Sequence, residues 1–177
     1  MSKVTVTFNK IIQVKESAHR YDIPRIINGP EDAAEAINGI LHLQDEAQEV
    51  LAILLLDTKN QVNGCHEISR GSLSASIVHP REVFKPAILC NAASIIMFHN
   101  HPSGNTEPSR EDVAVTTRIV KAGKIIDIPC LDHIIIGHHS YLSMKEKGLV
   151  IEVKNLDYSS LKKENLDKII EVVNNQL

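Results

Sequence analysis

The stretch VLAILLL (Val50–Leu56) is the longest unbroken apolar run in the chain, and the turn-forming residues DTKN (57–60) close it. This run is far shorter than the roughly 20 apolar residues that a membrane-spanning helix needs. A short aliphatic run that ends at a turn is typical of a strand buried on both faces of a sheet. The segment 62–68 follows the turn directly, so the two segments together predict a β-hairpin.

Strand and helix patterns alternate through the rest of the chain. NGPED (28–32) is a typical helix start, because proline is tolerated in the first turn and acidic side chains favour the positive end of the helix dipole. The periodicity predicts further strands at 4–14, 94–98 and 131–136, a short one after the turn 137–140, and helices at 30–41, 79–91, 109–122 and 158–177. Pro86 is expected to kink the second helix and Gly123 to end the third. This alternation predicts an α/β (mixed α+β) fold.

The composition is that of a globular protein, with 177 residues of which 43% are hydrophobic and 23% charged. The chain has 19 basic and 22 acidic side chains, only 3% aromatic residues and no tryptophan, so it lacks the basic surplus and the stacking side chains of a nucleic-acid-binding protein. The N-terminus carries no apolar signal segment, and the three cysteines form no C-x-x-C pair. We therefore expect a cytoplasmic protein with reduced thiols and no membrane contact.

The stretch FHNHPSGNTEPSRED (98–112) carries the strongest chemical signal. His99 and His101 stand two residues apart, which places them on one side of an extended segment, and Asp112 falls in the first turn of the helix that follows. Two imidazoles and one carboxylate are the donor set of a catalytic zinc site that keeps a fourth position for water. The same set also suits Fe(II), as in a two-His-one-carboxylate oxygenase. A plainer interpretation makes Ser109 and Asp112 a helix capping box without a metal.

Glu49 is the candidate general base, because it stands immediately before the buried segment Val50–Leu56 and is partly removed from water there. The alternative is a solvated acid in the local cluster 45–49. His133, on the segment 131–136, also has two interpretations. It is either a hydrogen-bonded core histidine or a residue that orients a metal ligand from behind. The residues alone leave both pairs of alternatives open.

The pattern His99-x-His101-x7-Ser109-x2-Asp112, with Glu49 upstream, resembles the signature of the JAMM (MPN-plus) metalloproteases. Five short sequence motifs resemble the RadC-like branch of that superfamily, namely LDTKN (56–60), VHPREVFK (78–85), NAA (91–93), HNHPSG (99–104) and LDHIIIG (131–137). Together they span about residues 45–150.

The resemblance implies a twisted mixed sheet flanked by helices, similar to the cytidine-deaminase-like architecture. It implies that His99, His101 and Asp112 bind Zn2+, that Glu49 is the general acid/base and that Ser109 helps to hold the oxyanion. The implied function is a zinc-dependent metallohydrolase, a JAMM-type peptidase or isopeptidase acting on a peptide or protein substrate, in a family labelled for DNA repair. The non-enzymatic alternative is a DNA-repair interaction module with a structural metal.

The implied organisation has three parts. Residues 1–44 form an N-terminal strand–helix extension, residues 45–150 the RadC-like JAMM/MPN domain, and residues 151–177 a C-terminal amphipathic helix. Larger RadC-like proteins carry a helix-hairpin-helix region, for which residues 1–45 are too short, so we do not expect direct DNA contact. The terminal segments are candidate surfaces for a partner or for a second copy of the chain.

Overall fold

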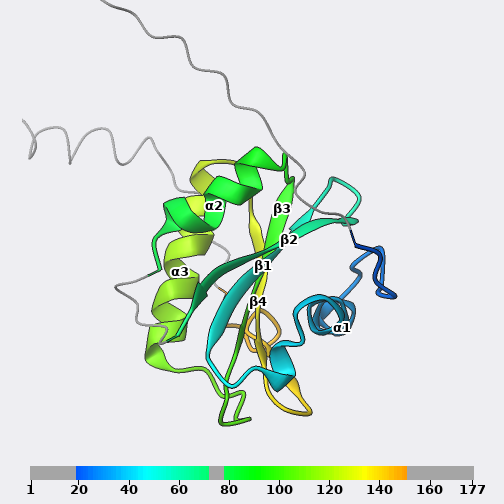
Figure 1. The fold of residues 1–177 in the computed structure, drawn as a ribbon. Coiled ribbons are helices and arrows are strands. Elements are labelled where there is room, and N and C mark those ends of the chain that lie inside the picture. Colours follow the sequence, from blue (N-terminus) through cyan, green and yellow to red (C-terminus); the bar gives the residue numbers. More distant parts are fainter. Residues whose placement is uncertain (1–18, 72–77, 151–177) are drawn as a thin grey trace, which may run out of the picture.

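The computed structural model describes residues 19–71 and 78–150 (Figure 1). The strand expected at 4–14 and the helix expected at 158–177 lie outside the described residues. The described elements are α1 (Pro30–Leu41), the 3-10 turn η1 (Leu43–Asp45), β1 (Val50–Leu56), β2 (Val62–Arg70), α2 (Pro80–Leu89), β3 (Ser94–Asn100), α3 (Arg110–Ile125), β4 (Cys130–Ile136) and β5 (Tyr141–Ser143). None of the helices in these ranges has the length and apolarity to cross a membrane.

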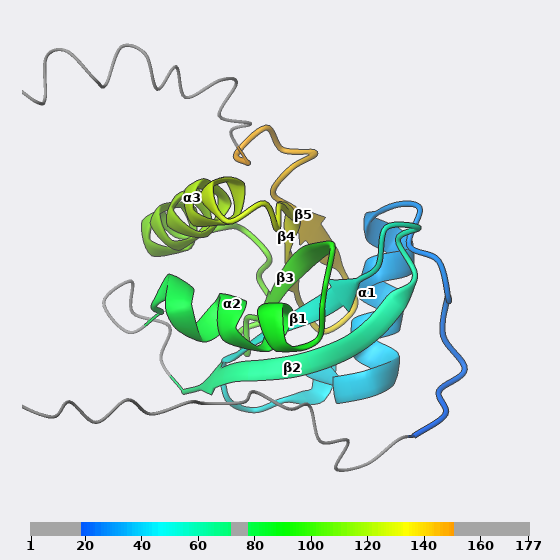
Figure 2. The ribbon, with the colours of Figure 1, turned by 90° about the horizontal axis from the view of Figure 1, so that it is seen from above.

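The strands form one mixed sheet of five in the order β2-β1-β3-β4-β5. The pair β3–β4 is parallel, and the other neighbouring pairs are antiparallel. Helix α1 covers one face of the sheet, and α2 and α3 cover the other (Figures 1 and 2). The predicted hairpin is confirmed as β1–β2, and the predicted mixed α/β fold with a helix-flanked sheet is confirmed as a whole.

The central strands β1 and β3 are buried along their whole length, because helices cover both faces of the sheet there. Alternate residues of β1 enter two separate cores. Ala52, Leu54 and Leu56 pack on the α1 side. Leu51, Ile53 and Leu55 pack on the side of α2 and α3. An unbroken aliphatic run, rather than an alternating one, is what such a two-sided strand requires.

Several predicted element ends differ from the structure, and two of these differences have a clear physical reason. Strand β3 does not stop at Phe98, because Leu51 of β1 pairs with His99 and Ile136 of β4 pairs with Asn100. Sheet pairing with both neighbours therefore extends the strand through the first histidine. The polar character of these residues misled the prediction, since the sequence pattern does not show pairing between distant segments.

Gly123 does not end α3, which continues to Ile125. A Cβ atom at Gly123 would lie 2.5 Å from the carbonyl oxygen of Ile128, so glycine here allows a close approach of the following loop. The Ile128 N–H donates a 2.9 Å hydrogen bond to the Gly123 carbonyl at this contact. The glycine is thus required by packing rather than by a helix cap.

Candidate metal centre

Three elements bring four of the five predicted site residues together. Glu49 immediately precedes β1, His99 lies near the end of β3 with His101 just beyond it, and Asp112 lies in the first turn of α3. Because Leu51 pairs with His99, the start of β1 lies beside the end of β3. One ligand atom from each of the four side chains lies within 4.8 Å of the others. His99 and Asp112 are buried, whereas Glu49 and His101 are half-buried.

The three predicted metal ligands form a close triangle. The Nε2 atoms of His99 and His101 are 2.9 Å apart. Oδ1 of Asp112 is 3.3 Å from Nε2 of His99, and Oδ2 of Asp112 is 3.6 Å from Nε2 of His101. The donor atoms therefore face a common point, as the ligands of one cation do.

The loop after β3 sets the tautomer of His101. Nδ1 of His101 lies 2.5 Å from the backbone carbonyl oxygen of Asn105. A carbonyl oxygen only accepts, so Nδ1 carries a proton and donates it. In the neutral ring, Nε2 then carries the lone pair, and it is Nε2 that faces His99 and Asp112. His101 thus presents the lone pair of Nε2 to the other residues of the cluster.

Ser109 and Asp112 form the predicted capping box at the start of α3. The backbone N–H and the hydroxyl of Ser109 both donate to Oδ2 of Asp112 at 2.7 Å, and the Asp112 N–H donates to the Ser109 hydroxyl oxygen. Burial opposes ionisation of Asp112, whereas the hydrogen bonds that its carboxylate accepts from Ser109 favour it, and the pKa of Asp112 is lowered. The helix cap and the expected metal ligand are therefore one arrangement, in which Ser109 holds the carboxylate of Asp112 in place.

Asn100 positions the segment that carries Glu49, a role that sequence reasoning missed. Its Oδ1 accepts a 2.7 Å hydrogen bond from the Val50 N–H, and its Nδ2 donates to the carbonyl oxygens of Glu46 and Gln48 at 3.1 and 3.0 Å. Asn100 is only 2% exposed. The available signal was its place between the two histidines, where strand alternation sends its side chain to the opposite face.

A comparison with known families agrees with this geometry. The profile of the RadC-like JAB domain family matches residues 27–149. The chain belongs to this family. The resemblance to the RadC-like branch is thereby confirmed, and the described fold, with its cluster of Glu49, His99, His101 and Asp112, is that of a RadC-like JAB domain.

Curated relatives of this RadC-like JAB domain carry the name UPF0758 protein. The protein from Clostridium beijerinckii is 51% identical over 124 residues, which cover 70% of this chain and 53% of the relative. The protein from Bacillus cereus is 53% identical over 133 residues, covering 75% and 56%. The protein from Methanosarcina acetivorans is 54% identical over 108 residues, covering 61% and 47%. The chain thus spans about half the length of the curated relatives it matches.

His133 of this RadC-like JAB domain is a buried, hydrogen-bonded histidine, and one of its contacts is with His99, an expected metal ligand. Nε2 of His133 lies 2.8 Å from Nδ1 of His99, and Nδ1 of His133 lies 2.6 Å from the hydroxyl oxygen of Thr116. His133 is 1% exposed, and this burial holds its pKa well below the usual value. The ring is therefore neutral and lies directly behind His99.

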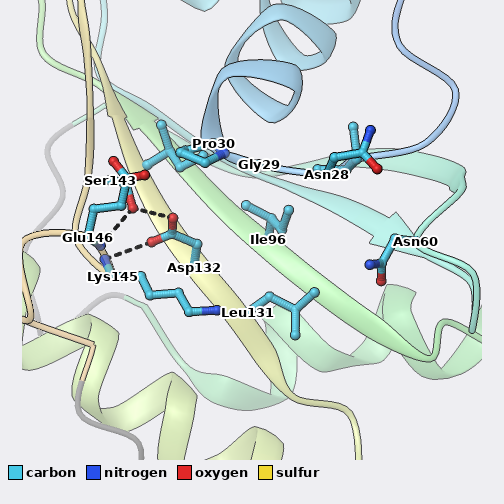
Figure 3. A pocket seen from close by; sticks show the side chains of 12 residues that line it. Asn28, Gly29, Pro30, Asn60, Ile96, Leu131, Asp132, Ser143, Lys145 and Glu146 are labelled. Atoms are coloured by element: carbon cyan, nitrogen blue, oxygen red, sulfur yellow. Dashed lines mark hydrogen bonds between the residues drawn. The ribbon is translucent and has the colours of Figure 1, made fainter.

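The neighbouring residue Asp132 faces the opposite side of the sheet. There it lines a cavity of about 490 Å³ whose floor includes Ile96 (Figure 3). Its carboxylate accepts hydrogen bonds from the Ser143 hydroxyl and from the backbone N–H groups of Lys145 and His133. Burial raises the pKa of Asp132. This cavity is lined by none of the four residues of the candidate metal centre.

Proposed function

We propose that the chain is a zinc-dependent metallohydrolase that cleaves a peptide or isopeptide bond. In this proposal His99, His101 and Asp112 hold the metal, Glu49 is the general acid/base and Ser109 assists at the oxyanion. The observation that supports it is the convergence of these groups, from three elements, on one point beside the half-buried carboxylate of Glu49. We further propose a protein or peptide substrate, a cytoplasmic location and the DNA-repair context of the RadC family label.

The residues present fit zinc. Two imidazoles and one carboxylate leave one position open, as in catalytic rather than structural zinc sites. The Nε2 lone pair of His101 and the ionised Asp112 provide donors that do not need to lose a proton first. Bound zinc supplies Lewis-acid polarisation of the scissile carbonyl and an acidified water.

In the proposed reaction, side chains of the protein transfer the protons and bind the oxyanion. Glu49 accepts the proton of the attacking water and delivers it to the leaving amine, and Asn100 holds the segment on which Glu49 stands. In this structure the Ser109 hydroxyl donates to Asp112, so it must turn its hydrogen toward the substrate to bind the oxyanion. The Ser109 backbone N–H stays on the carboxylate meanwhile. Loss of one such oxyanion donor costs about 2.7–4 kcal/mol in an acyl-transfer enzyme.

Metal analysis combined with cleavage assays tests the proposal. We expect the purified wild-type chain to contain zinc at one equivalent and the His99→Ala and Asp112→Ala variants to lose it. Glu49→Gln should fold, retain zinc and cleave a panel of quenched-fluorescence peptides and isopeptides about 10²- to 10⁴-fold more slowly than the wild type.

The rival functions give different results in the same experiment. Iron instead of zinc, with Glu49 dispensable, supports an oxygenase. Zinc that raises the melting temperature, with no cleavage by any variant, supports an interaction module with a structural metal. Wild-type cleavage that Glu49→Gln does not reduce contradicts the role of Glu49.

A further inference from the structure

Behind the metal centre, a line of hydrogen bonds joins two of the proposed ligands through residues that touch no metal. Thr116 of α3 contacts the backbone carbonyl of Asp112 at 2.6 Å. The same hydroxyl oxygen lies 2.6 Å from Nδ1 of His133, whose Nε2 lies 2.8 Å from Nδ1 of His99. Thr116, His133 and His99 are each at most 1% exposed, so water does not compete for these bonds.

The direction of each hydrogen bond follows from counting protons. The Thr116 hydroxyl has one hydrogen, and the Asp112 carbonyl can only accept, so the hydroxyl donates there. The Thr116 oxygen can then only accept from His133, which requires the proton of His133 to sit on Nδ1. If Thr116 donated to His133 instead, two oxygen lone pairs would face each other at 2.6 Å.

The position of the proton between Nε2 of His133 and Nδ1 of His99 follows from the charge of His133. A second proton would put a positive charge in a fully buried ring whose two nitrogens contact only a hydroxyl and another imidazole, which is costly. His133 is therefore neutral, and its Nε2 accepts. The contact with His99 then requires a proton on Nδ1 of His99 and leaves the lone pair of His99 on Nε2, the atom that faces His101 and Asp112.

We infer that Thr116 and His133 are positioning residues that fix the Nδ1-protonated tautomer of His99 and so direct its Nε2 lone pair at the metal. The inference rests on the metal centre of the proposed function. Metal-binding histidines usually donate their second ring nitrogen to a carboxylate, a carbonyl or water. Here the acceptor is a neutral imidazole, whose own tautomer is set by a threonine one turn after Asp112 in α3.

The consequence is an arrangement that needs a cation. With Nδ1 protonated in both rings, the Nε2 lone pairs of His99 and His101 face each other at 2.9 Å. Two such acceptors repel unless a positive charge lies between them. The hydrogen bonds from Thr116 through His133 to His99 thus raise the affinity of the centre for a metal ion, although neither Thr116 nor His133 touches the ion.

The matched variants Thr116→Val and Thr116→Ser test the inference in the chain of 177 residues. Valine keeps the shape of threonine but cannot accept from His133, so His133 is free to move its proton to Nε2 and force the wrong tautomer on His99. We expect Thr116→Val to bind zinc about 10- to 100-fold more weakly in competition with a chromophoric chelator. Thr116→Ser keeps the hydroxyl and should bind within about threefold of the wild type.

Nitrogen-15 NMR of the histidine rings reads the tautomers directly, without any activity assay. In the wild type at pH 8 we expect protonated Nδ1 and bare Nε2 on His133 with and without zinc, and protonated Nδ1 on His99. A protonated Nε2 on His133, or a Thr116→Val variant that folds and binds zinc like the wild type, overturns the inference. If the wild type shows the expected tautomers but binds no zinc, the proposed function fails and the assignment of the tautomers of His133 and His99 stands. Should Thr116→Val not fold, the wild-type spectra alone decide.

Discussion

Asn100 accepts a hydrogen bond of 2.7 Å from the backbone N–H of Val50, and this bond ties the end of β3 to the residue next to Glu49. Two further bonds from the same side chain, to the carbonyls of Glu46 and Gln48, complete the attachment. The histidines flanking Asn100 face the candidate metal centre, while Asn100 itself holds the segment that carries the proposed base, Glu49. One short segment thus organises both parts of the centre.

Asn100→Asp should disturb the position of the proposed base, Glu49, and leave the proposed metal ligands in place. Aspartate keeps the acceptor for Val50 but replaces two donated hydrogen bonds with a carboxylate facing two carbonyl oxygens. We expect the free energy of unfolding in urea to fall by about 1–3 kcal/mol. Zinc should still bind, because the flanking histidines are unchanged, while cleavage should fall in the manner of Glu49→Gln.

The exposed Asn63 of β2 offers a matched control. Asn63→Asp makes the same chemical change on the surface and should alter stability and cleavage little. Equal effects of the two substitutions would show that added charge, rather than the attachment by Asn100, is responsible.

Ser109→Ala should weaken both the start of α3 and the metal centre. It removes the capping hydroxyl and one of the two hydrogen bonds to Oδ2 of Asp112, while the backbone N–H remains. Loss of such a cap costs about 1 kcal/mol of stability, measurable as a lower urea midpoint. Zinc affinity should also fall, whereas Ser109→Thr should retain most of both. An alanine variant as stable as the wild type would contradict the capping role.

Gly123→Ala should destabilise the protein, although alanine favours a helix over glycine by about 1 kcal/mol. The added Cβ would stand 2.5 Å from the Ile128 carbonyl and 3.1 Å from the Phe84 ring, so the loop into β4 must shift. Gly39→Ala in α1 would bring its Cβ to 2.5 Å from the γ2 methyl group of Ile23, a side-chain atom rather than a backbone atom, and should cost less. Comparison of thermal midpoints checks this order, and a stabilised Gly123→Ala variant would refute the close-approach explanation.

Asp132 should make folding less favourable as the pH rises. Burial raises its pKa, with the hydrogen bonds from Ser143 and the backbone only partly offsetting it, so the folded chain holds this proton more firmly than the unfolded chain does. The stability linked to that proton is complete below the unfolded pKa and is lost as the pH passes the folded pKa. Asp132→Asn removes this dependence. In urea unfolding from pH 3 to pH 7, the stability of the wild type relative to Asp132→Asn should therefore decline, and an increase would contradict the assignment.

Local sequence patterns predicted much of the fold. The aliphatic run Val50–Leu56 predicted the central strand, the NGPED start predicted α1, and the Ser109–Asp112 spacing predicted the capping box that the structure contains. Each of these depends on residues within a few positions of one another, where backbone geometry decides which side chains meet. The wrong ends of β3 and α3 had distant causes, in pairing with β1 and β4 and in the packing of the loop at Ile128.

The sequence by itself determined which chemical groups are available at the centre. It places two histidines on one side of an extended segment and a carboxylate in the first turn of the helix that follows, and these residues match a family signature. Only the tertiary structure decided how these groups are held. Glu49 meets the histidines because β1 and β3 pair, and Asn100 reaches across 50 positions to Val50. His133 lies behind His99 because β3 and β4 run in parallel, which the pairing of Met97 with His133 records. The orientation and tautomer of a side chain depend on partners brought close by folding, and those partners are separated along the chain by distances that no local pattern spans.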